Sequence, residues 1–286
     1  MTRNPRIAIV GSGSLANFLA PALRKSGYAI TEIISRDSSR SLLNARRLAK
    51  RVGARAVTTK TAALDAALLW FCVPDREIRS AAAALGNCAR GNVRFAFHSS
   101  GALASRELGP LRKNGIAVAS VHPLMTFVPG GHPSLVGVPF AMEGDVMATR
   151  IARRVVRDLG GDFSLLQAKR KEAYHAWATM TSPLLLAFLV TLEDAGVVAG
   201  LTREDARRKS LPIIRQTLGN YSRLGPQNSF SGPIIRGDVE TVAKHLRALK
   251  KNPEARAVYV ALARSALRRL PVKNLKEMRK LLAIQS

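Results

Sequence analysis

The sequence predicts an α/β protein with a doubly wound parallel sheet, followed by an all-helical C-terminal domain. Up to residue 166, short aliphatic runs alternate with longer helix-compatible stretches, which is the rhythm of parallel strands joined by crossover helices. After that point the strand signals stop, and a second architecture begins. A glycine-rich turn directly after the first aliphatic run favours a ligand-binding sheet of this class.

Eight short runs predict strands, and most of them are separated by helix-compatible segments. They are Arg6–Val10, Ile30–Ser35, Arg55–Val57, Leu68–Val73, Val93–Phe97, Ile116–Val121, Pro139–Met142 and Phe163–Leu166. The last two flank a predicted helix at Asp145–Leu159, and we expect this strand, helix and strand to extend the same sheet. The dinucleotide-binding domain is therefore assigned to residues 1–166.

Residues 167–286 predict helices that are broken by glycines and prolines. The first long helix, Ala168–Val198, is apolar around much of its circumference, so its surface should be buried on several sides. We expect this domain to contribute to the substrate site and to form a homodimer. In the loop Gly232–Gly237 the glycines and a proline shape the chain, and Asp238 suits the N-cap of the next helix.

One apolar segment needs to be distinguished from a membrane span. Ala176–Leu192 has 17 residues without a formal charge. That is slightly short of the roughly 20 residues that cross a bilayer, and Thr and Ser residues and Pro183 interrupt the run. The sequence favours a buried helix and no membrane partner.

Composition limits the class of protein further. The 45 basic and 19 acidic residues give a net charge of +26, and 47% of the residues are hydrophobic, which indicates a globular basic protein. The densest basic stretch, Arg256–Lys280, spaces its charges like a solvated helix face, and no recognition motif accompanies it, so no specific nucleic-acid binding is predicted. Cys72 and Cys88 can form at most one bridge and no metal cluster, which fits a reducing cytoplasm and no metal site.

A GxGxxA motif follows the first predicted strand and begins a helix. In Gly11-Ser12-Gly13-Ser14-Leu15-Ala16, the first glycine permits a tight turn and the second lets the backbone approach a pyrophosphate. Ala16 lets the helix pack on the strand, while free N–H groups face the anion. The position of the motif predicts a dinucleotide site.

The end of the second predicted strand indicates which dinucleotide binds. NAD enzymes place an acidic residue there, on the ribose hydroxyls, whereas this chain has Ser35-Arg36 with Arg40 nearby. A guanidinium and a hydroxyl suit a 2′-phosphate, so the cofactor is predicted to be NADP.

Polar clusters follow three later strands, where open α/β sheets place the ligand crevice. They are Cys72-Val73-Pro74-Asp75, His98-Ser99-Ser100-Gly101 and His122-Pro123-Leu124. We expect them to converge beside the nicotinamide, with Cys72, Val73, Pro74 and His98 bordering the cofactor. His122 can serve as an acid or base near neutral pH, and Ser99 or Ser100 can hold a substrate oxygen.

These residues also carry a family resemblance. The whole chain resembles a bacterial Rossmann-like family in which a dinucleotide domain precedes a helical domain of unknown function, and whose members are named as NADP oxidoreductases. The matching segments are Gly11–Ala16, His98–Ala102, His122–Leu124 with Phe127, Tyr174–Ala176 and Ser231–Asp238.

More distantly, the layout is similar to pyrroline-carboxylate reductase, hydroxyisobutyrate dehydrogenase and prephenate dehydrogenase. The last of these uses a His-Pro pair as its catalytic histidine, which implies the same role for His122. In related dehydrogenases the long helix supplies polar groups to the cleft between domains, which implicates His175 and Lys171, although a solvated helix start explains Lys171 equally well. This chain has Pro183 where the family pattern usually has an Asn, so an amide donor is absent.

The resulting hypothesis is an NADP-dependent oxidoreductase that moves hydride between the nicotinamide and a small carbonyl, imine or alcohol in the interdomain cleft. The alternative is a dinucleotide-binding sensor or scaffold without turnover, because fold alone does not establish catalysis. His122, Ser99, Ser100 and His175 are the candidate catalytic residues.

Overall fold

The computed structural model describes residues 4–86, 92–128, 130–131 and 134–283, so Cys88 lies outside the described residues. The chain divides into two compact units, Met1–Thr179 and Met180–Ser286. The change from strands to helices lies after Leu165, before the point where the units divide. The residues of the helix between Lys171 and Thr179 therefore belong to the first unit.

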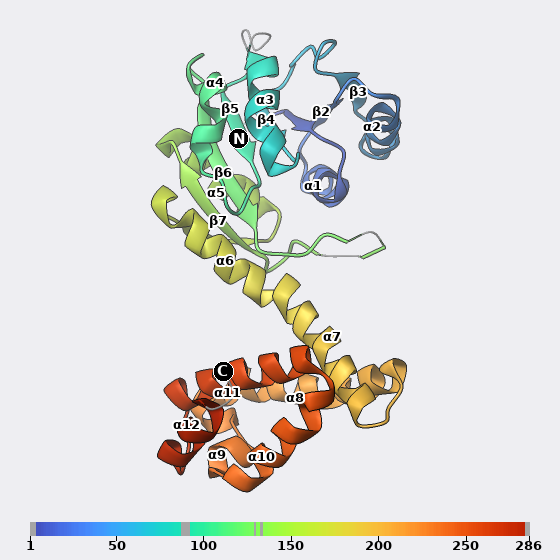
Figure 1. Cartoon of the computed structure of the whole chain (residues 1–286). Helices are drawn as coiled ribbons and strands as arrows, with labels where there is room; N and C mark the ends of the chain where they lie inside the picture. The colour runs from blue at the N-terminus through green and yellow to red at the C-terminus, as the bar shows by residue number, and fades with distance from the viewer. Residues whose placement is uncertain (1–3, 87–91, 129, 132–133, 284–286) are drawn as a thin grey trace. The chain divides into compact units, whose positions relative to one another are not determined.

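The first unit contains an eight-stranded sheet in the order β3-β2-β1-β4-β5-β6-β7-β8 (Figure 1). Neighbouring strands are parallel except β6 and β7, which are antiparallel. All eight predicted strands are confirmed, with ends that shift by no more than two residues. Their bounds are β1 Ile7–Val10, β2 Ile30–Ser35, β3 Arg55–Thr58, β4 Leu68–Phe71, β5 Phe95–His98, β6 Ala117–Pro123, β7 Pro139–Gly144 and β8 Asp162–Leu165.

Helices cover both faces of this sheet, as the continuous apolar strands require. On β1, Ile7 and Ile9 pack with α1, α2 and α5, whereas Ala8 and Val10 pack with α3 and α4 on the opposite face. The helices of this unit are α1 Ser14–Lys25, α2 Ser39–Val52, α3 Asp75–Gly86, α4 Gly109–Arg112, α5 Val146–Asp158 and α6 Lys171–Thr181, with 3-10 turns at Ser105–Leu108 and Ala168–Arg170.

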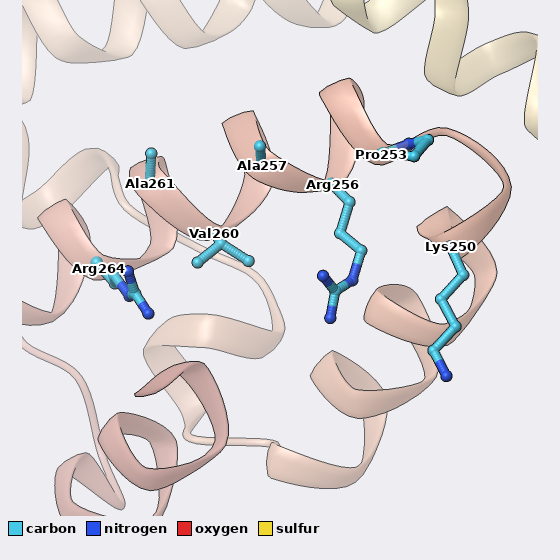
Figure 2. Close-up of a pocket in the computed structure, with 7 residues that line it drawn as sticks. All are labelled: Lys250, Pro253, Arg256, Ala257, Val260, Ala261 and Arg264. Atoms are coloured by element: carbon cyan, nitrogen blue, oxygen red, sulfur yellow. The ribbon is translucent and has the colours of Figure 1, made fainter. Parts of the chain in front are cut away.

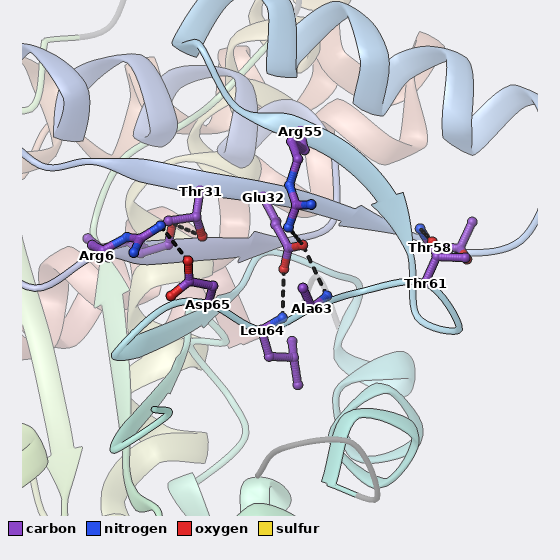
Figure 3. A network of polar contacts seen from close by, with 10 residues as sticks. Arg6, Thr31, Glu32, Arg55, Thr58, Thr61, Ala63, Leu64 and Asp65 are labelled. Atoms are coloured by element: carbon purple, nitrogen blue, oxygen red, sulfur yellow. Dashed lines mark hydrogen bonds and ion pairs between the residues drawn. The ribbon is translucent and has the colours of Figure 1, made fainter. Parts of the chain in front are cut away.

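A buried carboxylate on β2 fixes the connection between β3 and β4 (Figure 3). Glu32 is fully buried, and its carboxylate accepts hydrogen bonds from the backbone N–H groups of Ala63 and Leu64 at 3.1 and 3.0 Å. Arg55 of β3 pairs with the same carboxylate at 2.8 Å. Because the charge has three donors, its burial is compensated, and this group has a structural role.

The second unit is helical, as predicted. Its helices are α7 Pro183–Val198, α8 Arg203–Ser229, α9 Pro233–Arg236, α10 Val239–Ala248, α11 Pro253–Arg269 and α12 Leu275–Ala283, with a 3-10 turn at Leu249–Lys251. Residues of α10, α11 and α12 form its apolar core. The predicted N-cap is confirmed, because the Asp238 side chain accepts from the Thr241 N–H at 3.0 Å.

The predicted long helix Ala168–Val198 differs from the structure in two ways. It is interrupted at Ser182, where the backbone leaves helical geometry, and Pro183 begins α7 because a proline fits the first turn of a helix, where an N–H has no partner. The apolar stretch is also not buried by the chain itself, so the expected burial would require a partner. Leu184, Leu186 and Val190 are 53%, 63% and 45% exposed.

By length and composition, residues 168–198 qualify as a membrane span, but only 6% of the apolar window is buried in the structure. The first turn of this segment packs into the first unit, where Lys171 is 2% exposed. The segment is thus anchored in a folded domain at one end and interrupted in the middle.

Candidate functional site

The glycine turn after β1 has the geometry that a dinucleotide site needs. Gly11 has φ +105°, and a Cβ at this position would lie 2.5 Å from the carbonyl oxygen of Cys72. Only glycine fits there without moving a neighbouring strand. At Gly13, by contrast, a Cβ would meet no atom within 4 Å, so the space in front of this residue is open. Helix α1 begins next, and no side chain caps its N-terminus.

A hollow of about 550 Å³ lies at this turn. The predicted cofactor residues that line it are Gly11, Ser12, Gly13, Ser35, Arg36, Cys72, Val73 and Pro74. Ser41, Asn44 and Thr59 also line it and were not predicted, whereas Ser14, Leu15 and His98 are not among the lining residues. The carboxyl ends of β1, β2 and β4 thus meet at one cavity, as they do in doubly wound sheets that bind dinucleotides.

The predicted phosphate ligand Arg36 already has a partner. Its guanidinium pairs with the carboxylate of Glu77 at 3.0 Å, and the Arg36 side chain is 70% exposed. Because the guanidinium is largely solvated, the pair contributes little energy and the Arg36 side chain can rearrange. A 2′-phosphate at this point would compete with Glu77 for the guanidinium.

The polar clusters after β4, β5 and β6 converge, as predicted. The Ser100 hydroxyl donates to the Asp75 carboxylate at 2.7 Å and accepts from the Leu103 N–H at 2.9 Å. The Ser99 hydroxyl accepts from the Trp70 indole N–H at 2.9 Å. Both hydroxyls therefore have structural partners, and Ser100 is buried. Their assignment to a substrate oxygen stays a prediction.

His98 is fully buried at the end of β5. One ring nitrogen, Nδ1, lies 3.2 Å from the Ser100 N–H, and Nε2 lies 3.1 Å from the Ala104 carbonyl oxygen. Nδ1 must then accept and Nε2 donate, which defines a neutral ring. Burial, with smaller effects from Lys171 and His122, lowers the pKa of His98 to about 4. Both nitrogens are occupied by backbone groups, so this ring orders the loop that follows β5.

Lys171 is buried, and the interpretation as a solvated helix start is wrong. Its ammonium donates to the Ser100 carbonyl oxygen at 2.7 Å and to the Ser120 hydroxyl at 2.5 Å. Burial lowers the pKa of Lys171 to about 8, and the carboxylates of Glu143 and Asp75 oppose that shift. This ammonium ties α6 to the ends of β5 and β6.

His122 and His175 lie together beside Tyr174. His122 Nδ1 is 3.1 Å from the Tyr174 hydroxyl, and the two imidazole centroids are 6.1 Å apart. Burial is the main reason that the pKa of His122 falls to about 4, and Lys171 and His175 lower it further. The expectation that His122 titrates near neutral pH is therefore corrected. It is a neutral imidazole at pH 7, and its Nδ1 shares a hydrogen bond with the Tyr174 phenol, whose pKa is raised by burial; the ring tautomer decides which of the two donates.

Gly101 makes this arrangement possible. A Cβ on Gly101 would lie 2.9 Å from Nε2 of His122 and closer still to the ring of His175. The bare backbone lets both rings approach the loop after β5. Asp75, which holds Ser100, directly follows Pro74 of the cofactor hollow, so the two imidazoles and the hollow are linked by a short run of contacts.

The two depressed histidine pKa values should make stability depend on pH. In the unfolded chain both rings bind a proton near pH 6.5, whereas in the folded chain they stay neutral to about pH 4. Folding stability should thus be complete above pH 6.5 and decline toward pH 4, by up to about 3 kcal/mol for each ring. Urea unfolding between pH 7 and 4.5 measures the slope. His122→Asn should reduce proton uptake on unfolding by about one, and an unchanged slope would argue against the buried neutral ring.

The sequence analysis named Lys171 and Asp75 but did not predict that Lys171 is buried or that the carboxylates of Glu143 and Asp75 act on its pKa. A single lysine at a helix start carries no signal of burial, although its spacing of seven from buried Ala178 places both on one helix face. Among the described residues, no group of three or more His, Cys, Asp or Glu side chains could hold a metal ion.

The sheet, the glycine turn and its hollow define a Rossmann-like dinucleotide-binding oxidoreductase fold. Residues 6–93 match the family model described as "NADP oxidoreductase coenzyme F420-dependent", and residues 138–266 match that of a domain of unknown function (DUF2520). The chain thus matches an NADP oxidoreductase domain in its first part and this domain of unknown function in its second part.

Solved structures share the fold. A "putative NADP oxidoreductase" from Bacteroides fragilis is 21% identical with a TM-score of 0.73, over 92% of this chain and 98% of that one. A protein from Thermotoga maritima is 24% identical with a TM-score of 0.70, over 98% and 99%. A reductive aminase from Aspergillus terreus, solved with NADPH, is 15% identical with a TM-score of 0.63, over 99% and 100%. Among curated protein sequences, none matches this chain significantly.

Proposed function

We propose that this protein is an NADP(H)-dependent oxidoreductase that moves hydride between the nicotinamide and a small carbonyl, imine or alcohol. The observation that carries the proposal is the pairing of two features within one unit. The hollow at Gly11 and Gly13 fits a dinucleotide, and a buried imidazole cluster around His122 lies at the ends of neighbouring strands. Reductive enzymes such as the aminase with bound NADPH share this fold.

The residues fit the cofactor. The open space at Gly13 and the uncapped N-terminus of α1 suit a pyrophosphate, and Ser35 and Arg36 suit a 2′-phosphate. When bound, NADPH supplies the hydride. The protein supplies binding, orientation and proton management.

His122 would handle the proton as a neutral ring. With the Tyr174 phenol donating to Nδ1, the remaining proton sits on Nε2, which faces the loop at Gly101. That N–H can donate a hydrogen bond to a carbonyl oxygen of the substrate. In the other tautomer Nε2 can accept a proton from an alcohol. Lys171 acts as a positioning residue, because its ammonium is engaged by Ser100 and Ser120 and holds α6 in register with the strands.

Turnover separates this proposal from a non-catalytic sensor. The purified chain is mixed with NADPH and a panel of keto acids, aldehydes and cyclic imines, and absorbance at the nicotinamide band is followed. The same panel is run with His122→Asn as the matched control. Loss of NADPH that depends on both a panel member and His122 supports the enzyme. NADPH binding without consumption by any member supports the sensor instead.

Arg36→Ala should weaken NADPH binding by about 1.5–3 kcal/mol and leave NADH binding nearly unchanged, because only NADPH carries the phosphate that the guanidinium would pair with. Calorimetry with both cofactors measures the ratio. Glu77→Gln is the matched variant. It frees Arg36 and removes a nearby negative charge, so NADPH should bind more tightly. If Arg36→Ala lost the same affinity for NADPH and for NADH, Arg36 would not bind the 2′-phosphate.

We also propose a homodimer formed by α7 and α8. Both helices expose large apolar side chains, namely Leu184, Leu186, Val190, Val197, Ile213, Leu218, Tyr221 and Leu224. A soluble monomer rarely leaves such an extended apolar surface to water. Light scattering at micromolar concentration should give about twice 30.9 kDa. Leu186→Lys with Ile213→Lys should shift the mass to that of one chain, and a monomeric wild-type protein would rule the proposal out.

The cytoplasm remains the compartment that we propose. Cys72 is a buried free thiol, and burial raises its pKa, so it is an unreactive core residue. A protein that uses NADPH must also be located where that cofactor is present.

A further inference from the structure

The net charge of +26 is not explained by a cofactor site, and the second unit concentrates part of it. From Arg256 to Lys280 there are eight basic residues and one acidic residue. The ion pairs found in the described part of this unit lie on α7, α8 and α10. In the same part of the chain, Lys250, Arg256, Arg268 and Arg279 form no ion pair, so their charge is not neutralised by neighbouring carboxylates.

These cations border two adjoining hollows on α11 and α12. The first, of about 390 Å³, is lined by Lys250, Arg256 and Arg264 around a floor of Pro253, Ala257, Val260 and Ala261. Figure 2 shows the charged ends of Lys250 and Arg256 extended in the same direction. The second, of about 480 Å³, is lined by Arg264, Arg268 and Arg279 with Leu267, Leu282 and Ala283. Arg264 lines both hollows, and none of the lining residues is acidic. The two neighbouring hollows are together called the basic groove.

The spacing of the arginines gives the groove its length. Arg256, Arg264 and Arg268 lie eight and four residues apart on α11, along an inclined row that turns by about 40° around the helix every four residues. This inclined row is called the stripe. At 1.5 Å per residue the stripe spans about 18 Å. Small side chains, Ala257 and Ala261, stand beside it and keep the groove open. A stripe of this length presents several positive charges to one extended ligand.

Two of the arginines are held in place by hydrogen bonds to backbone carbonyl oxygens of the same unit. Arg256 Nε donates to the Leu246 carbonyl oxygen at 3.3 Å, near the end of α10, and Arg264 donates to the Leu282 carbonyl oxygen at 2.6 Å, near the end of α12. Each contact uses part of a guanidinium that has five N–H donors. For Arg256 the terminal N–H groups are thereby oriented before any ligand arrives, which lowers the entropy cost of binding.

We propose that this basic groove binds the phosphate backbone of duplex nucleic acid without regard to sequence. Arginines spread over about 18 Å of α11, with Lys250 and Arg279 beside them, can contact several phosphates of one backbone, to which guanidinium groups bind in bidentate fashion. No aromatic side chain lines either hollow, so base stacking is not offered and the contacts read no sequence. A protein partner fits less well, because a floor of alanines and one valine offers no deep pocket for the aromatic anchors that stabilise protein interfaces.

The test uses the full chain and a fluorescein-labelled duplex DNA of about 20 base pairs, with binding followed by anisotropy from about 50 to 200 mM KCl. The triple variant Lys250→Gln, Arg268→Gln, Arg279→Gln removes three exposed cations. Its slope of log affinity against log salt should be shallower than that of the wild type by about 2.7, since each phosphate contact contributes about 0.9. The matched control, Arg46→Gln, Arg47→Gln, Lys50→Gln, removes the same charge from α2 and should change the slope by less than about 1.

Two further measurements keep the result unambiguous. Thermal unfolding of both triple variants should match the wild type, because the replaced side chains are exposed. Hydrogen exchange with bound duplex should show protection in α11 and α12 and none in α2. If both triple variants reduced the salt slope of DNA binding equally, the groove would not be the binding site. Equal affinity for polyglutamate of the same charge would overturn the phosphate assignment. Neither result depends on turnover, so the outcome is separate from that of the proposed function.

Discussion

His122→Asn should lower kcat about 100-fold or more once a substrate is found, with little change in NADPH affinity. In the proposed function the imidazole handles the proton at Nε2, and the substitution removes that group. Asn keeps a polar side chain of similar reach to Nδ1, so the contact with Tyr174 survives in part. Stopped-flow or steady-state absorbance measures kcat, and calorimetry measures NADPH affinity.

Tyr174→Phe is the matched variant for this prediction. It removes only the phenol that donates to Nδ1, so it should reduce kcat less than His122→Asn does and should shift the pH dependence of kcat. A kcat for His122→Asn equal to that of the wild type would reject the proton-handling role. A large loss in NADPH affinity for the same variant would instead place His122 in cofactor binding.

The second large effect concerns the two glycines of the cofactor turn. Substitution of Gly11 should lower folding stability, whereas substitution of Gly13 should lower NADPH affinity. Gly11→Ala places a Cβ 2.5 Å from a backbone oxygen at a φ of +105°, so it should cost about 3 kcal/mol of folding stability. Gly13→Ala meets no protein atom within 4 Å, so its stability should change by less than about 1 kcal/mol. Its NADPH affinity should nevertheless fall at least tenfold, because the added methyl occupies the space of the pyrophosphate.

Urea unfolding and calorimetry on both glycine variants separate these outcomes. Unfolding reports the strain at Gly11, and cofactor titration reports the steric effect at Gly13. If Gly13→Ala binds NADPH as the wild type does, the pyrophosphate does not lie at this turn. If Gly11→Ala is as stable as the wild type, the turn is more adaptable than its backbone geometry indicates.

The fold could be predicted closely because its signals are local. Strands buried on both faces appear as continuous aliphatic runs, and β2 at Ile30–Ser35 agrees residue for residue. Strand ends shift where hydrogen bonding continues into polar residues, as at β5, which extends to His98. The break at Ser182 was harder to predict, since the apolar pattern continues through Pro183 and hides the start of a new helix.

The candidate site could be predicted only in part because it depends on long-range contacts. The glycine turn and His122 follow from their positions at strand ends. The burial of Lys171 does not, because its partners Ser100 and Ser120 lie 71 and 51 residues away in the chain. Burial of the His122 ring itself is the main reason that its pKa is low, and the nearby Lys171 and His175 lower it further; none of these surroundings can be inferred from local sequence.

The most direct test of the central claim is calorimetric titration of the wild-type chain with NADPH and with NADH at one fixed ionic strength. The hollow at Gly11, Gly13 and Arg36 predicts that both cofactors bind at one site per chain and that NADPH binds at least tenfold more tightly. Absence of binding, or equal affinity for the two cofactors, would contradict the account.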